Sequence, residues 1–178
     1  HRLKSGMPPR AFWGMHLAHI GVAVFVIGVT MVKGYETEKD VRMAPGETVV
    51  IGGYTVRMIG IKDVMGPNYR AARGEFELSR DGVVLHTLHP EKRAYLSSAM
   101  PMTEAAIDTS LLRDVYVSLG EQVGEKDGSG AWSVRVHHKP FVIWIWGGCL
   151  LMALGGFLAI SDRRYRLKAG GARVGALL

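Results

Sequence analysis

Cysteine is almost missing from this 178-residue chain, which contains only Cys149. A lone cysteine can form neither an internal disulfide nor a cysteine-based metal site. The H-E-x-x-H zinc motif, a glycine-rich phosphate loop and the common serine and cysteine nucleophile motifs are also missing from the sequence. These absences argue against a self-contained hydrolase or kinase.

Charged side chains are absent from two long apolar runs, residues 11–32 and 141–160. At ~1.5 Å rise per residue, helices of this length reach about 30 Å, the thickness of the hydrocarbon core of a bilayer. The first run is long for a signal peptide and has no small-residue cleavage site before Lys33. The second run carries Trp144 and Trp146 near its start, as expected at a membrane interface. Both runs are predicted to be transmembrane helices.

Small residues mark the faces on which these helices are expected to pack, because they let two backbones approach closely. At ~100° per residue, one stripe of the first helix contains Gly14, Ala18, Gly21 and Gly28. In the second helix, the corresponding small residues are expected to be Gly148, Cys149, Ala153 and Gly156.

Two histidines, His16 and His19, lie in the first run, on the side opposite the small residues. Their expected neighbours are Ala23, Val26 and Thr30. An ionisable side chain in a span costs free energy and needs a partner, a ligand or a water-filled cavity. The histidines could hydrogen-bond to another helix. Alternatively, one could be an axial ligand of a metal or a haem iron, and His19 lies nearer the middle of the span.

The positive charge of the chain, +6 in total, is concentrated at its two ends. Residues 1–10 carry +3 and residues 162–178 carry +4, whereas residues 33–140 carry −1. Because the basic residues flank the spans, they argue for membrane topology and against nucleic-acid binding. The positive-inside rule predicts cytoplasmic termini and an extracytoplasmic loop, which in a bacterium lies in the periplasm.

The loop between the two runs has the pattern of short β-strands separated by turns. Gly52-Gly53 and Asp81-Gly82 are predicted hairpin turns, and a short helix is expected at residues 101–112. The predicted strands are residues 48–51, 54–61, 74–79, 83–88, 113–119 and 132–137. Strands of this kind predict a small barrel or a sandwich.

Ionisable residues in the loop show no recognised catalytic spacing. The histidines are His86, His89, His137 and His138. Without H-E-x-x-H or Cys/His spacing, they are expected to be strand residues exposed to solvent rather than metal ligands. The charged stretch at residues 91–114 is expected to be a solvated face with salt bridges, and a docking surface for a charged partner is the alternative.

Several sequence segments together resemble the CcmF family, the haem-lyase subunits of bacterial cytochrome c maturation. They are WGMHLAHIGVAV at 13–24, EKDVRM at 38–43, GPNYR at 66–70, EKRAY at 91–95, MTEAAID at 102–108, RDVYVSLGE at 113–121, and KPFVIWIWGG with MALGG between 139 and 156. The resemblance covers nearly the whole chain.

The resemblance implies an inner-membrane protein that takes haem from a haem chaperone and helps to attach it to the CXXCH cysteines of apocytochrome c. It also implies that His19, in the motif A-H-I-G, is an axial ligand of a transmembrane haem b, a position that His16 does not match. The tryptophan-rich periplasmic motif of the family, its flanking histidines and the other transmembrane ligand are absent from this sequence. The chain is therefore expected to act with the remainder of a haem-lyase complex or of a longer parent chain.

The predicted fold class is an integral membrane protein in which two transmembrane α-helices flank a mainly β periplasmic domain. The expected parts are a cytoplasmic segment (1–10), a helix with the histidines (11–33), the β-rich domain (34–140), a second helix (141–161) and a basic cytoplasmic tail (162–178). The leading hypothesis is a haem-handling component of cytochrome c biogenesis. The alternative is a non-enzymatic anchor that presents the β domain to partner proteins.

Overall fold

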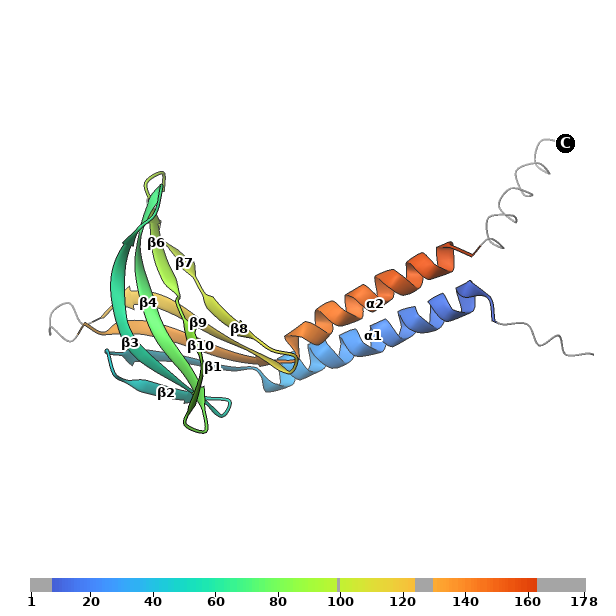
Figure 1. Cartoon of the computed structure of the whole chain (residues 1–178), viewed down its shortest axis with the longest axis horizontal. Coiled ribbons are helices and arrows are strands. Elements are labelled where there is room, and N and C mark those ends of the chain that lie inside the picture. The colour runs from blue at the N-terminus through green and yellow to red at the C-terminus, as the bar shows by residue number, and fades with distance from the viewer. Residues whose placement is uncertain (1–7, 99, 124–129, 163–178) are drawn as a thin grey trace, which may run out of the picture. The chain divides into compact units, whose positions relative to one another are not determined.

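The computed structural model describes residues 8–98, 100–123 and 130–162 of the chain (Figure 1). Two units are present: Val32–Pro140 forms a β unit, and the segments before and after it form a helical unit. Most of the basic residues behind the predicted topology fall in residues 1–7 and 163–178, outside the described residues.

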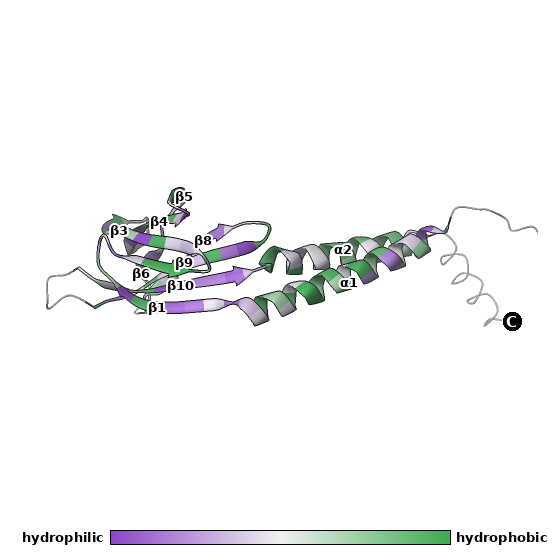
Figure 2. Cartoon of the chain, turned by 90° about the horizontal axis from the view of Figure 1, so that it is seen from below, coloured by the Kyte–Doolittle hydropathy of each residue, from purple (hydrophilic) through white to green (hydrophobic). Residues whose placement is uncertain are grey.

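The helical unit consists of α1 (Arg10–Tyr35) and α2 (Val142–Ile160), both long and apolar enough to cross a membrane. Figure 2 shows hydrophobic residues along most of both helices. An α-helix satisfies its backbone N–H and C=O groups internally, which hydrocarbon requires. At the start of α1, where such groups lack partners, the backbone N–H of Ala11 donates a hydrogen bond to the Asp162 carboxylate at 3.1 Å. The end of the α2 segment thereby caps α1.

Buried glycines form the contact between the two helices, which run antiparallel. A Cβ added at Gly21 would lie 2.6 Å from the backbone nitrogen of Met152, and one at Gly148 would lie 2.6 Å from that of Phe25. Only residues without a side chain allow this approach. The buried glycines are Gly14, Gly21 and Gly28 of α1 and Gly148 and Gly155 of α2.

These contacts confirm the small-residue stripe predicted for α1 but only part of the one predicted for α2. Gly148 is buried as expected, whereas Cys149 and Ala153 are exposed. The second buried glycine is Gly155 rather than Gly156. A spacing of seven residues, close to two helical turns, keeps successive glycines on one face, and Gly148 and Gly155 have this spacing.

The β unit is a sandwich of two antiparallel sheets that face one another in Figure 1. The four-stranded sheet has the order β1 (Thr37–Met43), β10 (Trp132–Pro140), β9 (Arg113–Gln122), β8 (Ala106–Thr109). The six-stranded sheet has the order β2 (Thr48–Ile51), β3 (Tyr54–Met65), β4 (Tyr69–Arg80), β6 (Glu91–Tyr95), β7 (Met102–Glu104), and β5 (Val83–Leu88) pairs with β4. This architecture confirms the predicted fold class of two apolar helices flanking a mainly β domain.

The core of the sandwich lies between the sheets. Every second residue of the central strands points inward and is buried, as in Val115-Val117-Leu119 of β9 and Val134-Val136 of β10. Phe76 and Leu78 of β4 and Val56 and Met58 of β3 face them from the other sheet. This burial supplies the main driving force for folding of the domain.

Both predicted hairpin turns are confirmed. The backbone φ angles are +55° at Gly52 and +79° at Gly53, and +51° at Asp81 and +79° at Gly82. Positive φ at both central residues is the mark of the tight turn that matches the twist of antiparallel strands.

The helix predicted at residues 101–112 is wrong. This segment contains β7, which pairs with β6, and β8, which pairs with β9. Its β-branched residues Thr103, Ile107 and Thr109 suit strands, and pairing with neighbouring strands overrides the local helical pattern. Two further strands, β1 and β6, were also not predicted, because their charged sequences TEKDVRM and EKRAY lack an apolar alternation.

Replacing Gly148 by Val should destabilise the helix pair by about 1–3 kcal/mol, since its side chain would meet the backbone of α1. Thermal unfolding of the chain in detergent, followed by circular dichroism, measures the loss. Gly147→Val is the matched control, because a Cβ at Gly147 has no neighbour within 4 Å. Equal unfolding temperatures for the two variants would contradict the packing described.

Candidate functional site

His19 is exposed on α1, and its Nδ1 donates a hydrogen bond to the backbone carbonyl of Met15 at 2.7 Å. A proton on Nδ1 leaves the lone pair of the neutral imidazole on Nε2. Backbone carbonyls commonly orient metal-binding histidines in this way. His19 can therefore offer Nε2 as a ligand on the outer side of the helix pair.

His16 makes the same kind of backbone hydrogen bond, to the Phe12 carbonyl at 2.8 Å. Its ring also packs against the Phe12 ring, with 4.1 Å between the centroids. One turn away from His19 on either side are Met15 and Ala23, a flexible side chain and a small one. His19 thus has more adaptable surroundings than His16.

The helix face that carries His19 is apolar and faces away from α2. Ala23, Val26 and Thr30 lie on this face and are exposed, as predicted, whereas the glycine stripe is buried on the opposite side. An apolar face that carries an outward imidazole at His19, with His16 one turn away, suits a flat, largely apolar macrocycle that needs an axial nitrogen. The residues present therefore fit the haem group that the resemblance implies.

The loop histidines contact groups within the β unit. His86 Nδ1 lies 2.5 Å from the Asp108 carboxylate, and His137 Nδ1 lies 3.6 Å from that of Glu38. His138 is half-buried and stacks on the Tyr54 ring at 6.0 Å between centroids. No three His, Cys, Asp or Glu side chains converge as a metal site within residues 8–98, 100–123 and 130–162.

The charged stretch at residues 91–114 is less solvated than predicted, because three of its carboxylates are buried: Glu91, Asp108 and Asp114. Glu91 accepts hydrogen bonds from Arg73 at 2.5 Å and from Arg93 at 2.7 Å, and Asp108 accepts one from Arg113. Buried charges persist when they are paired and hydrogen-bonded. The Glu91–Arg73 and Asp108–Arg113 pairs each join two strands, which the order of residues along the chain does not reveal.

Asp114 differs from the other two buried carboxylates, since burial raises its pKa. The Tyr116 hydroxyl donates a hydrogen bond to Oδ2 of Asp114 at 3.3 Å. The other oxygen, Oδ1, has no hydrogen-bond partner among the described residues. Asp114 is therefore the least well compensated of the three.

A cluster that sequence reasoning missed lines a pocket of about 590 Å³ at one end of the sandwich. Its polar members are Ser110, in the turn before β9, and Tyr54, Arg80, Arg113 and His138, which come from four different strands. The Arg113 and Arg80 guanidinium groups lie 4.4 Å and 5.2 Å from the centroid of the Tyr54 ring. The only signals in the sequence are the two hairpin turns that bring Tyr54 and Arg80 to this end.

The two arginines set the protonation of their neighbours. Burial alone would raise the pKa of Tyr54, but hydrogen bonding and charge from Arg113 and Arg80 hold it below its usual value. Burial, helped by the positive charge of Arg113, lowers the pKa of His138. His138 is therefore neutral at neutral pH, and the formal charge lining this pocket comes from Arg80 and Arg113.

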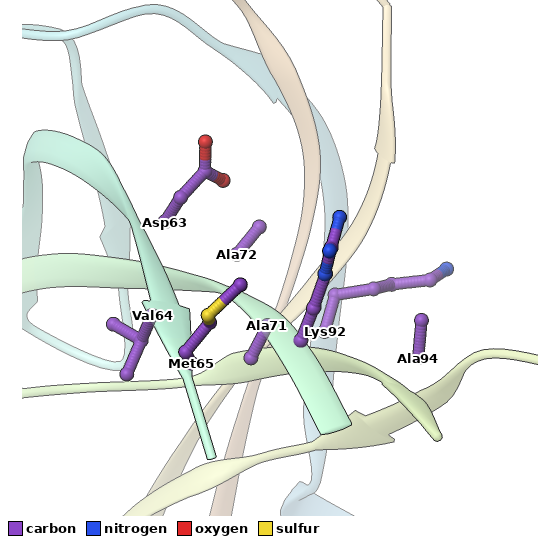
Figure 3. A pocket seen from close by; sticks show the side chains of 8 residues that line it. Asp63, Val64, Met65, Ala71, Ala72, Lys92 and Ala94 are labelled. Carbon is purple, nitrogen blue, oxygen red and sulfur yellow. The ribbon is translucent and has the colours of Figure 1, made fainter. Parts of the chain in front are cut away.

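A second, smaller hollow of about 440 Å³ lies on the six-stranded sheet (Figure 3). The short side chains of Ala71 and Ala72 lie between Asp63 and Lys92 in this view. Lys92 is engaged by Glu121, with 2.5 Å between Nζ and Oε1. The lining residues provide no nucleophile with an adjacent base, so this hollow has the character of a polar surface depression.

Two apolar helices around a β-sandwich define a membrane protein with one folded domain between its spans. Residues 34–140 match the family described as "CcmF C-terminal beta-sandwich", and the chain belongs to the CcmF family.

Curated relatives agree with this assignment. The chain is 53% identical to the cytochrome c-type biogenesis protein CcmF of Pseudomonas aeruginosa. The matched region is 159 residues long and covers 89% of this chain and 24% of the relative. The corresponding values for CcmF of Escherichia coli are 45% identity over 156 residues, covering 88% of this chain and 24% of the relative. The chain thus spans about a quarter of the length of these relatives.

A solved structure, "Cytochrome c Heme Lyase CcmF", has the same fold. It superposes with a TM-score of 0.70 over 86% of this chain and 25% of that chain, at 21% sequence identity. The pair of helices and the sandwich therefore occur together in an experimentally determined membrane protein.

Replacing Glu91 by Gln should lower the free energy of unfolding by about 1–3 kcal/mol at neutral pH, because two charge-assisted hydrogen bonds weaken. Arg93 above all, and also Arg73, hold the Glu91 pKa below its ordinary value of 4.5 against the opposing effect of burial. The stabilisation is thus present above about pH 4.5 and is lost as the pH falls through the folded-state pKa.

Thermal unfolding of the wild type and Glu91→Gln across this pH range measures the effect. The exposed Asp63→Asn change is the control for loss of one negative charge. A gap between wild type and Glu91→Gln that stayed constant down to pH 2 would rule out the ionised Glu91 as its cause.

Proposed function

We propose that this chain is a haem-handling part of a membrane-bound cytochrome c haem lyase, in which His19 is one axial ligand of a transmembrane haem b. The observation that supports this most directly is the orientation of His19: its Nδ1 is held by the Met15 carbonyl and its Nε2 is available on the exposed apolar face of α1. The relatives named cytochrome c-type biogenesis proteins set the process in which such a ligand would act.

His19 is favoured over His16 on three grounds. It stands nearer the middle of the span, it matches the A-H-I-G position of the family, and the small Ala23 lies one turn beyond it. His16, by contrast, packs its ring against Phe12. Both imidazoles can be neutral ligands, so the distinction rests on depth and surroundings.

The second axial ligand of the haem would come from the part of the parent protein that this chain does not contain. A haem held by two histidines is six-coordinate and supplies electron transfer rather than substrate binding. Such a haem would keep the iron of the substrate haem reduced during attachment to a CXXCH segment of apocytochrome c. The partners proposed are the remainder of the lyase complex, a haem chaperone and apocytochrome c.

We further propose that the protein lies in the inner membrane of a bacterium, with the β-sandwich in the periplasm and both termini in the cytoplasm. The proposed cytoplasmic ends are residues 1–10 and 162–178. The proposed spans are residues 11–33 and 141–161, and the domain between them is residues 34–140. The distribution of basic residues supports this orientation.

A second candidate function is a non-enzymatic anchor that presents the sandwich to partner proteins. The buried ion pairs around Glu91 and Asp108 favour this anchor role for the β domain, because the charged residues there are engaged in stabilising contacts between strands. The two candidates differ in whether His19 binds haem.

In the full-length parent protein, His19→Ala should abolish or strongly shift the haem b absorbance and impair cytochrome c maturation, because the iron loses an axial nitrogen. His16→Ala should change both much less. Absorbance spectra of the purified proteins and the yield of holocytochrome c, at matched protein levels, give the result. An unchanged spectrum with full maturation in His19→Ala would favour the anchor function.

The proposed orientation predicts that a cysteine introduced in the sandwich is labelled from the periplasmic side. Glu47→Cys in a Cys149→Ser background, treated with a membrane-impermeant maleimide in intact spheroplasts, should react fully, since position 47 is exposed in the turn before β2. Labelling only after the cells are broken would reverse the orientation.

A further inference from the structure

Both connections to the apolar helices lie at the same end of the four-stranded sheet. β1 begins with Thr37 paired to His138, and β10 ends with Pro140 paired to Arg113. The turn between β8 and β9, residues 110–112, therefore lies at the same end of this sheet as the two connections.

This turn exposes two large apolar side chains, Leu111 at 67% and Leu112 at 56%. In the neighbouring β5, Val83 and Val84 are exposed at 63% and 55%. Apolar side chains that gather at one end of a folded domain mark a surface that is covered in its normal setting.

The missed pocket lies at this end, because Leu111, Leu112 and Pro140 line it together with Arg80 and Arg113. Pro140 precedes the first residue of α2, Val142, by two positions, so the pocket wall and the membrane-spanning helix are separated by at most about 8 Å of chain. A residue of the pocket wall is thus followed almost at once in the chain by an apolar span, and such a span ends at the headgroup region of a bilayer.

The charges at the pocket favour an anion. Two guanidinium groups approach one tyrosine ring. The buried carboxylate of Asp108 accepts a hydrogen bond from Nη1 of Arg113 and also lies 2.5 Å from Nδ1 of His86. The buried Nε of Arg113 has no hydrogen-bond partner among the residues that the structure describes. The nearest carboxylate to Arg80, Asp81 at 3.7 Å, is almost fully exposed to solvent. An anion in the pocket would therefore offset the repulsion between the two cations.

We propose that this end of the sandwich binds the phosphate headgroup of an anionic membrane phospholipid through Arg80 and Arg113, while Leu111 and Leu112 insert into the acyl region beneath it. Arginine is well suited to phosphate because its planar donors match two phosphate oxygens. Apolar side chains next to basic residues are the usual means by which a protein surface holds a membrane interface. The site would fix the domain against the bilayer, and it does not depend on His19 binding haem.

Insertion of the turn is tested by depth-dependent quenching in the whole chain. A fluorescent NBD group is attached to Leu112→Cys, or to the control Leu96→Cys, in a Cys149→Ser background reconstituted in phosphatidylglycerol nanodiscs. Leu96 is 79% exposed and directly follows β6. The last residue of β6 pairs with Tyr69 at the start of β4, whereas Arg80 is at the other end of β4, so Leu96 is distant from the proposed site. Lipids with a spin label near the headgroup should quench the group at position 112 at least roughly twofold more than the group at position 96. Equal quenching at the two positions would overturn the insertion.

Headgroup binding is tested by native mass spectrometry of the chain released from the same nanodiscs. Arg80→Gln should lower the fraction of protein that retains phosphatidylglycerol, with roughly a tenfold weaker affinity for one lost charge-assisted bond. Arg70→Gln, an exposed arginine at the opposite end of the same strand, is the matched control and should retain the lipid. Equal retention by the two variants would overturn the proposal.

The source of the phosphate is distinguished by adding inorganic phosphate to the nanodiscs before release. If the site takes a lipid, millimolar phosphate should leave retention and quenching unchanged. Displacement of phosphatidylglycerol together with loss of quenching at position 112 would instead identify a site for free phosphate.

Discussion

Hydrocarbon cannot hydrogen-bond to the backbone, and this constraint shapes the whole chain. It requires α1 and α2 to be helices, and it leaves close packing rather than the hydrophobic effect to hold them together. The glycines provide that packing, since Gly21 and Gly148 bring the two backbones to a distance that no side chain permits. In the β unit, β1 follows α1 along the chain and β10 precedes α2, and these two strands pair side by side.

The two faces of α1 have different roles: one packs against α2, and the other carries the proposed haem ligand. One face is used by the glycine contact, so the other is free to carry His19 with its Nε2 exposed. An imidazole oriented by a backbone carbonyl needs no second side chain to fix its tautomer. The proposed ligand position is thus built on a single helix, and the proposal assigns the remaining coordination to other helices of the parent protein.

The charged residues of the sandwich serve two different purposes. Around Glu91, arginines neutralise a buried carboxylate and join β4 to β6, which explains why a charged segment can be a strand. Around Tyr54, two arginines meet, and among the described residues Asp108 is the buried carboxylate that hydrogen-bonds one of them. The first arrangement is complete in itself, whereas the second has the excess of donors expected of a binding site.

Sequence reasoning succeeded where local pattern and physical cause coincide. The apolar runs, the turns at Gly52-Gly53 and Asp81-Gly82, and the strands β2 and β5 have local signals that no distant contact overrides. It failed where pairing with a distant strand determines the local structure. Residues 101–112 form strands because they pair with β6 and β9. The charged segments β1 and β6 are strands because they pair with β10 and β4.

The sites follow the same rule. His19 stands out in the sequence because an ionisable residue in an apolar run is rare. The pocket with Tyr54, Arg80 and Arg113 could not be predicted, since residues from different strands meet only after the sheets have paired. The choice of Gly155 over Gly156 likewise depends on the crossing of two helices rather than on either helix alone.

Chemical rescue of the proposed ligand tests the central claim most directly. In the full-length parent protein, His19→Gly leaves a space that free imidazole can enter, and imidazole should restore the absorbance and the reduction potential of the bis-histidine haem. The matched His16→Gly protein should have a near-normal spectrum that imidazole does not alter. A His19→Gly protein with a normal haem spectrum and no response to imidazole would contradict the account.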